Sequence, residues 1–175
     1  MRLETSQTIV RLERKAIERG HAKGRIVGCS AKLVALALVS DQLHANGFQV
    51  FRRADLSKLT APDPYAEFVD EALRLRGERW PRARMDLTSW RALVGSVRLR
   101  FPFITVHTEV EDPDVCYIGR PVRMTSRTLT LATIGPDAIW HGTARSLPWG
   151  HVSRIDVGGA YEAALDLVVR SRQTP

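Results

Sequence analysis

The stretch Gly24-Arg25-Ile26-Val27 is matched, 95 positions later, by Gly119-Arg120-Pro121-Val122. The same offset aligns two further pairs: Leu36-Ala37 with Leu131-Ala132, and Gly47 with Gly142. Glycines that suit turns therefore recur together with the apolar residues between them. Self-similarity over a period of this length predicts a duplicated module.

The alignment continues through the C-terminal part of each copy after one insertion. An extra residue, placed near Gly150, raises the offset to 96. Beyond it the matched segments are Leu56-Ser57-Lys58-Leu59 with Val152-Ser153-Arg154-Ile155, Tyr65 with Tyr161, and Asp70 with Asp166. A unit of this size can just bury a core of its own, so we expect each unit to be stabilised by packing against the other.

Five strands are expected in each copy. The clearest is 103–110, where apolar and polar residues alternate and β-branched residues are frequent; its counterpart is 8–15. The other expected strands are 22–29, 32–39, 48–52 and 54–59 in the first copy, and 115–124, 127–134, 143–147 and 151–157 in the second. Asn46-Gly47 suits a turn that needs positive φ between the third and fourth strands.

Apolar spacing predicts three helices. One helix closes each copy, because apolar residues follow the spacing i, i+3, i+4, i+7, i+8 in both. Those positions are Tyr65, Phe68, Val69, Ala72 and Leu73, repeated as Tyr161, Ala164, Leu165, Val168 and Val169. The third helix is expected over 89–99, with Thr88 or Ser89 as N-cap and with Trp90, Leu93, Val94 and Val97 on one face.

These elements predict a mainly β chain with short helices, of the α+β class. Five short strands are too few for a sandwich, so we expect two tandem five-stranded small barrels, partly open and each followed by a helix. The expected boundaries are 1–76 for the first repeat with its closing helix, 77–88 for a basic linker, and 89–175 for the second repeat with leading and closing helices.

The succession of strands resembles the Sm-like barrel, and the tandem form is similar to an uncharacterised bacterial family of tandem Sm-like small β-barrels. The resemblance rests on 48–56 and on the region from Tyr117-Ile118-Gly119-Arg120 through 155–161. It implies RNA binding or a ring-forming scaffold.

Two motifs of the Sm-like family are absent from this sequence. Ala31-Lys32 and Ser126-Arg127 stand where the first motif has Asp or Asn. The second motif, a basic residue followed by glycine, is missing near 59–60 and 155–156. The family's uridine pocket is therefore not carried over to these positions.

The formal net charge of +7 and the pI near 10.1 favour a polyanionic partner, RNA or an acidic protein. Only four of the 26 basic residues are lysine, so a GC-rich genome explains the arginine excess equally well. The two cysteines form no paired motif, and no segment has the apolar run of a signal peptide or a membrane span. We therefore expect a reduced, cytoplasmic protein outside the membrane.

The strongest candidate for nucleic-acid binding lies between the copies, where five arginines surround one tryptophan: Arg74, Arg76, Arg79, Trp80, Arg82 and Arg84. Arginine binds phosphate through paired N–H donors, and an exposed indole stacks on a base. The alternative is a solvated linker whose tryptophan packs on the junction. A second basic pair, Arg52-Arg53, lies next to Asp55, and there a surface ion pair is the simpler role.

One loop of the second copy brings an acid, an indole and an imidazole together: Asp137, Trp140 and His141. It is the candidate ligand loop, and the alternative is a long hairpin with the indole folded onto the barrel. The five histidines show no metal-binding spacing, so no metal and no cofactor are expected.

Catalytic signatures are absent from the sequence. Neither G-x-S-x-G nor G-x-x-x-x-G-K occurs, so we expect neither a serine nucleophile nor a phosphate loop. Cys116 and His107 could meet across adjacent strands, but a buried cysteine is usually a small apolar filler. No catalytic residue is assigned.

The sequence therefore predicts a non-catalytic binding module that engages RNA or another polyanion through the basic junction. The alternative is a protein–protein interaction module, such as an adaptor or a toxin-neutralising, immunity-like protein, that uses exposed edge strands. A third class is a small-molecule pocket at the candidate ligand loop. A monomer or a homodimer is expected in preference to a large ring.

Overall fold

The structure, a computed structural model, describes residues 5 and 7–173. In this part of the chain the first copy contains β1 (Ile9–Glu13), β2 (His21–Cys29), β3 (Leu33–Val39), β4 (Ala45–Arg52), β5 (Lys58–Thr60) and α1 (Ala66–Leu75). The second contains α2 (Trp90–Val97), β6 (Ile104–His107), β7 (Cys116–Met124), β8 (Thr128–Ile134), β9 (Trp140–Pro148), β10 (Arg154–Val157) and α3 (Ala160–Gln173). The mainly β composition and the three helices are as expected.

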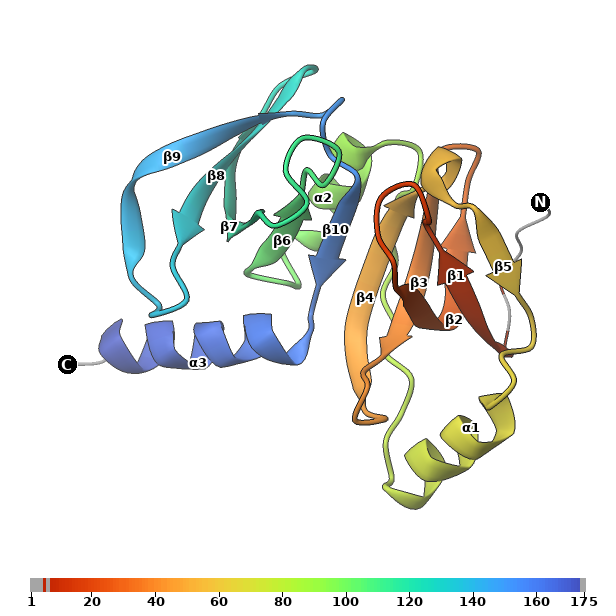
Figure 1. Ribbon diagram of the computed structural model, residues 1–175. Helices are drawn as coiled ribbons and strands as arrows, with labels where there is room; N and C mark the ends of the chain where they lie inside the picture. The colour runs from red at the N-terminus through yellow and green to blue at the C-terminus, as the bar shows by residue number, and fades with distance from the viewer. Residues whose placement is uncertain (1–4, 6, 174–175) are drawn as a thin grey trace.

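All ten strands belong to one antiparallel sheet in the order β5-β1-β2-β3-β4-β10-β6-β7-β8-β9. The second copy repeats the strand order of the first, since each has its fifth strand beside its first and its fourth at the far side. The two halves join where β4 pairs with β10, with Val50 opposite Ile155. In Figure 1, β10 lies between β4 and β6.

The sheet is not closed into a barrel. Closure of each copy would require its fourth strand to pair with its own fifth strand. Instead, β4 gives its outer edge to β10 of the other copy, while β5 and β9 form the two ends of the shared sheet. The expected pair of small barrels is therefore not confirmed, because the inter-copy pairing occupies the edge that closure would use.

Strand pairing corrects the position of the inserted residue. Leu33 is opposite Arg52 in the first copy and Thr128 is opposite Pro148 in the second, so the offset has already reached 96 within β9. The β8–β9 pairing shifts between Ala132 and Ile134 at a bulge. The extra residue is therefore accommodated in β9, and not near Gly150, because a bulge absorbs one residue without disturbing the flanking ladder.

The first strands of the two copies align one residue away from the expected match. Val10 is opposite Gly24, and Ile104 is opposite Gly119. The offset between β1 and β6 is thus 94, whereas 8–15 was matched to 103–110 at 95. The difference matters because a shift of one residue moves every side chain of a strand to the other face of the sheet.

The core between the two copies is organised by α2. Its expected apolar face is buried, and the hydroxyl of Ser89 caps its first turn by accepting the Ala92 N–H at 3.1 Å. Around it pack Ala35, Ala37, Phe48 and Val50 of the first copy and Ile104, Val106, Leu129, Leu131 and Ile155 of the second. One helix therefore holds both copies in a common core.

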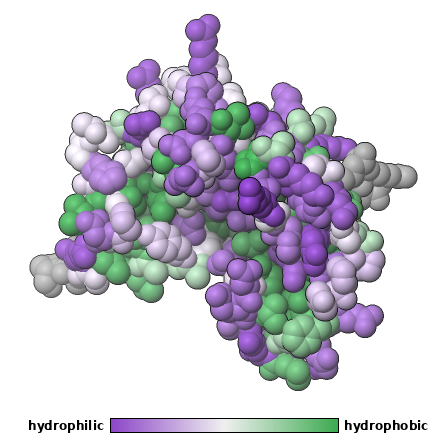
Figure 2. Space-filling model, viewed as in Figure 1, coloured by the Kyte–Doolittle hydropathy of each residue, from purple (hydrophilic) through white to green (hydrophobic). Residues whose placement is uncertain are grey.

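The closing helices bury a narrower stripe than the spacing predicted. In α1, Val69 and Leu73 are buried against the sheet, but Tyr65 and Phe68 are 63% and 61% exposed. In α3, Leu165 and Val169 are likewise buried, while Tyr161, Ala164 and Val168 are exposed. Apolar side chains consequently gather on the surface over α1, at the lower right of Figure 2.

The start of β4 reaches across to the second copy. Asn46 and Gly47 lie within this strand, at a shift in its pairing with β3, and not in the β3–β4 turn as expected, because that turn is formed by 40–44. The side chain of Asn46 accepts the Ala160 N–H at 2.8 Å and so caps α3. Gly47 has the expected positive φ, 67°, and a Cβ there would lie 2.5 Å from backbone atoms of Gly158 and Gly159. This irregular position in β4 requires glycine both for its conformation and for the close approach of the second copy.

No helix in the described part of the chain combines the length and the apolar character needed to cross a bilayer.

Candidate nucleic-acid interface

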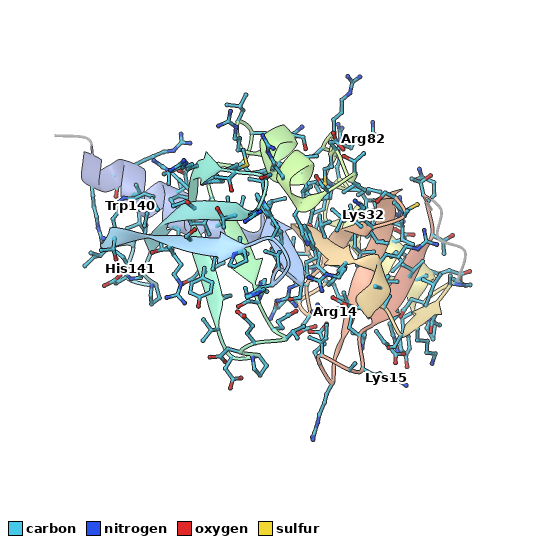
Figure 3. The ribbon with its side chains drawn as sticks, turned by 90° about the horizontal axis from the view of Figure 1, so that it is seen from above. Arg14, Lys15, Lys32, Arg82, Trp140 and His141 are labelled. Atoms are coloured by element: carbon cyan, nitrogen blue, oxygen red, sulfur yellow. The ribbon has the colours of Figure 1, made fainter. Side chains whose placement is uncertain are left out.

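The linker between α1 and α2 forms no strand or helix, and it carries four of the five predicted arginines, while Arg74 lies in the last turn of α1. Figure 3 places Arg82 and Lys32 on the α2 side of the molecule, and Arg14 and Lys15 on the opposite side. The sequence-predicted site thus lies on the same side as the turn between β2 and β3.

Two of the five arginines are engaged within the protein. The guanidinium of Arg76 donates to the carbonyl oxygens of Gln42 at 3.0 Å and Leu43 at 2.8 Å. Arg74 lies 3.7 Å from the carboxylate of Glu71 on the same helix. The contacts of Arg76 fix the end of α1 to the β3–β4 turn, which is a structural role.

Trp80 is half-buried and held on the first copy. Its indole N–H donates to Asp70 at 3.3 Å, and the Arg25 guanidinium lies 4.6 Å from the ring centroid. Arg25 also donates to the same Asp70 oxygen at 2.7 Å. The indole is therefore partly buried against the first copy, with Arg25 over its ring, and it also lines a surface cavity together with Arg79 and Arg82.

Three linker arginines remain available. Arg79, Arg82 and Arg84 are exposed, and none makes a hydrogen bond or ion pair with any residue that the structure describes. They are spread over six residues of extended chain. Unengaged guanidinium groups are suited to phosphate because every donor of the planar fork is available.

A cavity of about 640 Å³ opens where the two copies meet, and we call it the junction cavity. Its lining comes from five segments distant in sequence and includes Lys32, Arg52, Trp90, Arg91, Ser126 and Trp149. The other lining residues are alanine, leucine, serine and glycine, so none of the described residues that line it is acidic. Sequence reasoning missed this site because only the fold brings the five segments together.

Of the three basic side chains that line the junction cavity, one is hydrogen-bonded within the protein and two are exposed. Arg52 donates to the carbonyl oxygens of Gly150 at 2.7 Å and Val152 at 2.6 Å and so links the copies. It also lies 4.0 Å from Asp55, at the limit of an ion pair. Lys32 and Arg91 are exposed, and their side chains contact no carboxylate within the described chain.

The side chains of the candidate ligand loop lie in two different environments. The Trp140 ring stacks on Phe103 with centroids 5.7 Å apart, and the Arg120 guanidinium lies 5.2 Å from it. His141 instead faces Thr133, with Nδ1 3.1 Å from the hydroxyl, and Asp137 accepts the Ile139 N–H within its own turn. The indole is therefore part of the packing under α3, while the imidazole faces a separate cavity.

That separate cavity, of about 530 Å³, lies beneath α3 and is lined by His107, Cys116, His141, Asp156 and Glu162 among others. Cys116 is directly opposite His107 on neighbouring strands, as expected, but it is exposed and is not a buried filler. Although the residue as a whole is exposed, partial burial of its thiol group and the negative charge of Asp156 raise the pKa of Cys116. The thiol is therefore not activated as a nucleophile.

No cluster of three metal-ligating side chains occurs among the residues that the structure describes. His107 Nε2 lies 3.1 Å from the Asp156 carboxylate, and Arg154 lies 3.1 Å from the same ring. A guanidinium beside the imidazole makes this group a salt-bridge network and not a cation site.

The network continues to the seam between the copies through Arg14 and Glu109. Burial alone would raise the pKa of Glu109, but hydrogen bonds from Arg14 and the charge of Arg154 outweigh it and lower that pKa. Arg154 Nη1 lies 3.1 Å from Glu109 Oε1, and Ser153 donates to Oε2 at 2.9 Å. The carboxylate is thus held ionised on the side of the sheet opposite the junction cavity.

Comparisons of the chain with protein-family models, with curated proteins and with solved structures found no match.

Proposed function

We propose that this chain is a non-catalytic RNA-binding module built from two Sm-like units that share one open sheet. The repeated strand order and the resemblance of 48–56 and 117–161 support the Sm-like assignment. The observation that carries the binding proposal is the set of three exposed, unengaged linker arginines, Arg79, Arg82 and Arg84. The net charge of +7 gives the whole chain a favourable long-range attraction to a polyanion.

The test is the affinity of the full chain for a fluorescently labelled single-stranded RNA, measured by anisotropy over a range of salt. Affinity should fall as salt rises, because bound phosphates release counterions. The variant Arg79→Ala, Arg82→Ala, Arg84→Ala should reduce the slope of log K against log salt by about 2, at about 0.7 per lost phosphate contact.

A charge-matched control removes three cations from elsewhere in the first copy: Lys15→Ala, Arg19→Ala and Lys58→Ala. Lys15 lies on the side opposite Arg82 in Figure 3. The control should retain the slope of the unmodified protein. Equal losses in both triple variants, or no binding at low salt, would reject the linker as the RNA site.

A second candidate function, protein–protein interaction through an edge strand, is favoured by β9. This strand is nine residues long, pairs only with β8, and is exposed over 141–146. An exposed edge of this length offers backbone donors and acceptors to a strand of a partner.

Its test is a pull-down from a nuclease-treated lysate, compared with the variant Thr143→Pro. Thr143 lies in the β9 bulge, where proline is tolerated but an incoming strand is obstructed. A partner captured by the unmodified protein and by Thr143→Val, but lost with Thr143→Pro, would support this candidate. Capture that is indifferent to the proline would exclude the β9 edge.

A further inference from the structure

A buried carboxylate without a cationic partner faces the cavity beneath α3. Glu162 is 9% exposed and lines this cavity, and its Oε1 accepts a hydrogen bond from the Thr105 hydroxyl. Among the residues that the structure describes, none donates to Oε2 and no basic side chain pairs with the carboxylate. A buried charge is costly unless it is paired. We propose that the cavity beneath α3 binds a small organic amine, whose ammonium group pairs with Glu162.

The internal repeat shows that the scaffold does not require this carboxylate. At the offset of 96, Glu162 aligns with Ala66, which lies in the same first turn of the closing helix of the first copy. Ala66 is 8% exposed and packs in an apolar cluster with Val69 and Leu73. The first copy is therefore closed by a small apolar side chain where the second has a charged one, so closure of the fold does not account for Glu162.

One wall of the cavity is a row of four side chains on the same face of the sheet. Asp156 of β10 is opposite Gln49 of β4 and Thr105 of β6, and Thr105 is opposite Ile118 of β7. Opposite residues of antiparallel strands point to the same face, and all four line the cavity. In Figure 1, α3 lies along the lower end of the second copy. Because Gln49 belongs to the first copy, both copies build the site.

This wall supplies further acceptors beside Glu162. The Gln49 amide donates to Asp156 at 3.4 Å, which leaves its carbonyl oxygen available. Thr105 gives its hydroxyl proton to Glu162, so the lone pairs of the hydroxyl oxygen are available as well. An ammonium group has three N–H donors and no acceptor. A carboxylate, an amide carbonyl and a hydroxyl oxygen together match those donors.

The charge of the lining selects a cation. Asp156 belongs to the salt-bridge network, because Arg154 Nε lies 3.2 Å from its Oδ1 and His107 donates to its Oδ2 at 3.1 Å. No lysine or arginine occurs among the described residues that line the cavity. With the lining histidines neutral, Glu162 therefore leaves an unpaired negative charge in a concave surface, which attracts a positively charged ligand.

The rest of the lining fits a short apolar body. Leu38, Ile118 and Ile134 line the cavity, and its volume of about 530 Å³ is in the range of cavities that enclose small ligands. Cys116 and His141 are exposed, so the opening to solvent lies on their side. The ligand class is therefore a monoamine with a short hydrocarbon part that enters with its ammonium group foremost.

The test titrates three ligands of similar size into the full chain by calorimetry: phenethylamine, phenethyl alcohol and hydrocinnamate. The amine should bind about tenfold more tightly than the alcohol, because hydrogen bonds to a charged group are stronger than neutral ones, and the carboxylate should not bind. Glu162→Gln should weaken binding of the amine about tenfold and leave that of the alcohol unchanged. The control is Glu67→Gln, which removes an exposed acidic side chain from the first turn of α1 and should bind the amine like the unmodified protein.

Two further variants decide the matter if Glu162→Gln does not fold. Glu162→Ala introduces the residue that the first copy holds at Ala66, so it should keep the fold and weaken the amine to the same extent. Cys116→Trp, at an exposed strand position, should narrow the opening without a change of charge and weaken the amine and the alcohol alike.

The site is independent of the proposed RNA-binding function. The variant Arg79→Ala, Arg82→Ala, Arg84→Ala should bind phenethylamine like the unmodified protein, whatever its affinity for RNA. A folded Glu162→Ala protein that retains full affinity for the amine would overturn the proposal, as would no binding of any ligand or equal binding of all three. Displacement of the amine by an equal concentration of calcium ions would assign the site to an inorganic cation instead. Tighter binding of a lysine-containing peptide than of the free amine would overturn the assignment to a small molecule.

Discussion

Arg14 of the first copy donates two parallel hydrogen bonds to the Glu109 carboxylate of the second, from Nη1 to Oε2 at 2.7 Å and from Nη2 to Oε1 at 2.9 Å. Arg14 is 1% exposed and Glu109 is 9% exposed, so water screens this pair little. The same guanidinium donates through Nε to Glu18 at 2.9 Å and lies 4.9 Å from the centre of the Phe51 ring. The pair therefore couples the position of one copy to that of the other.

Removing the charge of Glu109 should destabilise the whole chain. Glu109→Gln leaves Arg14 buried without its main partner, which should cost about 3 kcal/mol in the free energy of unfolding measured with urea. Glu111→Gln, at an exposed position two residues later, is the control and should change stability little. Equal stability of the two variants would contradict the coupling of the copies through this pair.

The Glu109 carboxylate should also make stability depend on acid pH. Its pKa is lowered in the folded protein, so its contribution is fully present above the ordinary glutamate pKa of about 4.3 and is lost as pH falls through the lower folded value. The free energy of unfolding should decrease less steeply below pH 4 in Glu109→Gln than in the unmodified protein. If the free energy of unfolding of the two proteins had the same dependence on pH, the acid sensitivity would not come from Glu109.

Two glycines that the repeat aligns should respond differently to alanine. Gly47→Ala places a Cβ 2.5 Å from the backbone of the second copy at a φ of 67°, and we expect a loss of about 2 kcal/mol or more. A Cβ added at Gly142 would have no heavy atom within 4 Å. The free energy of unfolding of Gly142→Ala should therefore stay within about 0.5 kcal/mol of that of the unmodified protein. Thermal melts of the two variants make the comparison.

Shortening a buried side chain of α2 should destabilise both copies together. Leu93 is fully buried in the core that residues of both copies share, and Leu93→Ala should cost about 3 kcal/mol. Leu99→Ala, at a side chain 92% exposed, is the matched control. Hydrogen exchange in β3 and β8 should accelerate together in Leu93→Ala, and acceleration confined to one copy would show that the core is not shared.

Arg76 and Arg79 should affect different properties, because the first is bonded within the protein and the second is not. Arg76→Ala removes donors to the Gln42 and Leu43 carbonyls, so it should lower the melting temperature without changing the salt slope of RNA binding. Arg79→Ala should leave the melting temperature unchanged and reduce the slope by about 0.7. The reverse pattern would show that Arg76 leaves the protein to bind phosphate.

Cys116 should react slowly despite its exposure. Burial of the thiol and the charge of Asp156 raise its pKa, so less thiolate is present at neutral pH than in a peptide of the same sequence. Alkylation by iodoacetamide in a Cys29→Ser background should be slower than in that peptide and should accelerate only at more alkaline pH. A rate equal to that of the peptide would rule out the shift.

Periodicity predicted the strands and helices because each depends on residues close in sequence. The expected helix over 89–99 is observed at Trp90–Val97 with Ser89 as its cap, and Gly47 has the expected positive φ, although Asn46-Gly47 lies within β4 and the turn itself is at 40–44. Even Cys116 and His107 face each other across neighbouring strands. These features follow from alternation, capping and turn chemistry alone.

The features that depend on the meeting of the two copies could not be predicted in the same way. Whether β4 pairs with β5, the next strand in sequence, or with the distant β10 is not decided by any local pattern near Val50. The contacts of Trp80 with Asp70 and Arg25 are of the same kind, since these residues are 10 and 55 positions away in sequence. The junction cavity combines five segments, and in the sequence Lys32 is only a departure from a motif.

The pairing of β4 with β10 also affects how the chain folds. Gln49 and Asp156, which face each other in that pairing, are 107 residues apart, so during synthesis β4 is made long before its partner strand. Until then its edge is open, and Phe48 and Val50 have only earlier strands to pack on. The helix α2 is synthesised in the interval and covers both side chains in the finished core. It is thus placed to cover the apolar face of the growing sheet, while the β4 edge stays open to strands of other nascent chains until β10 is made.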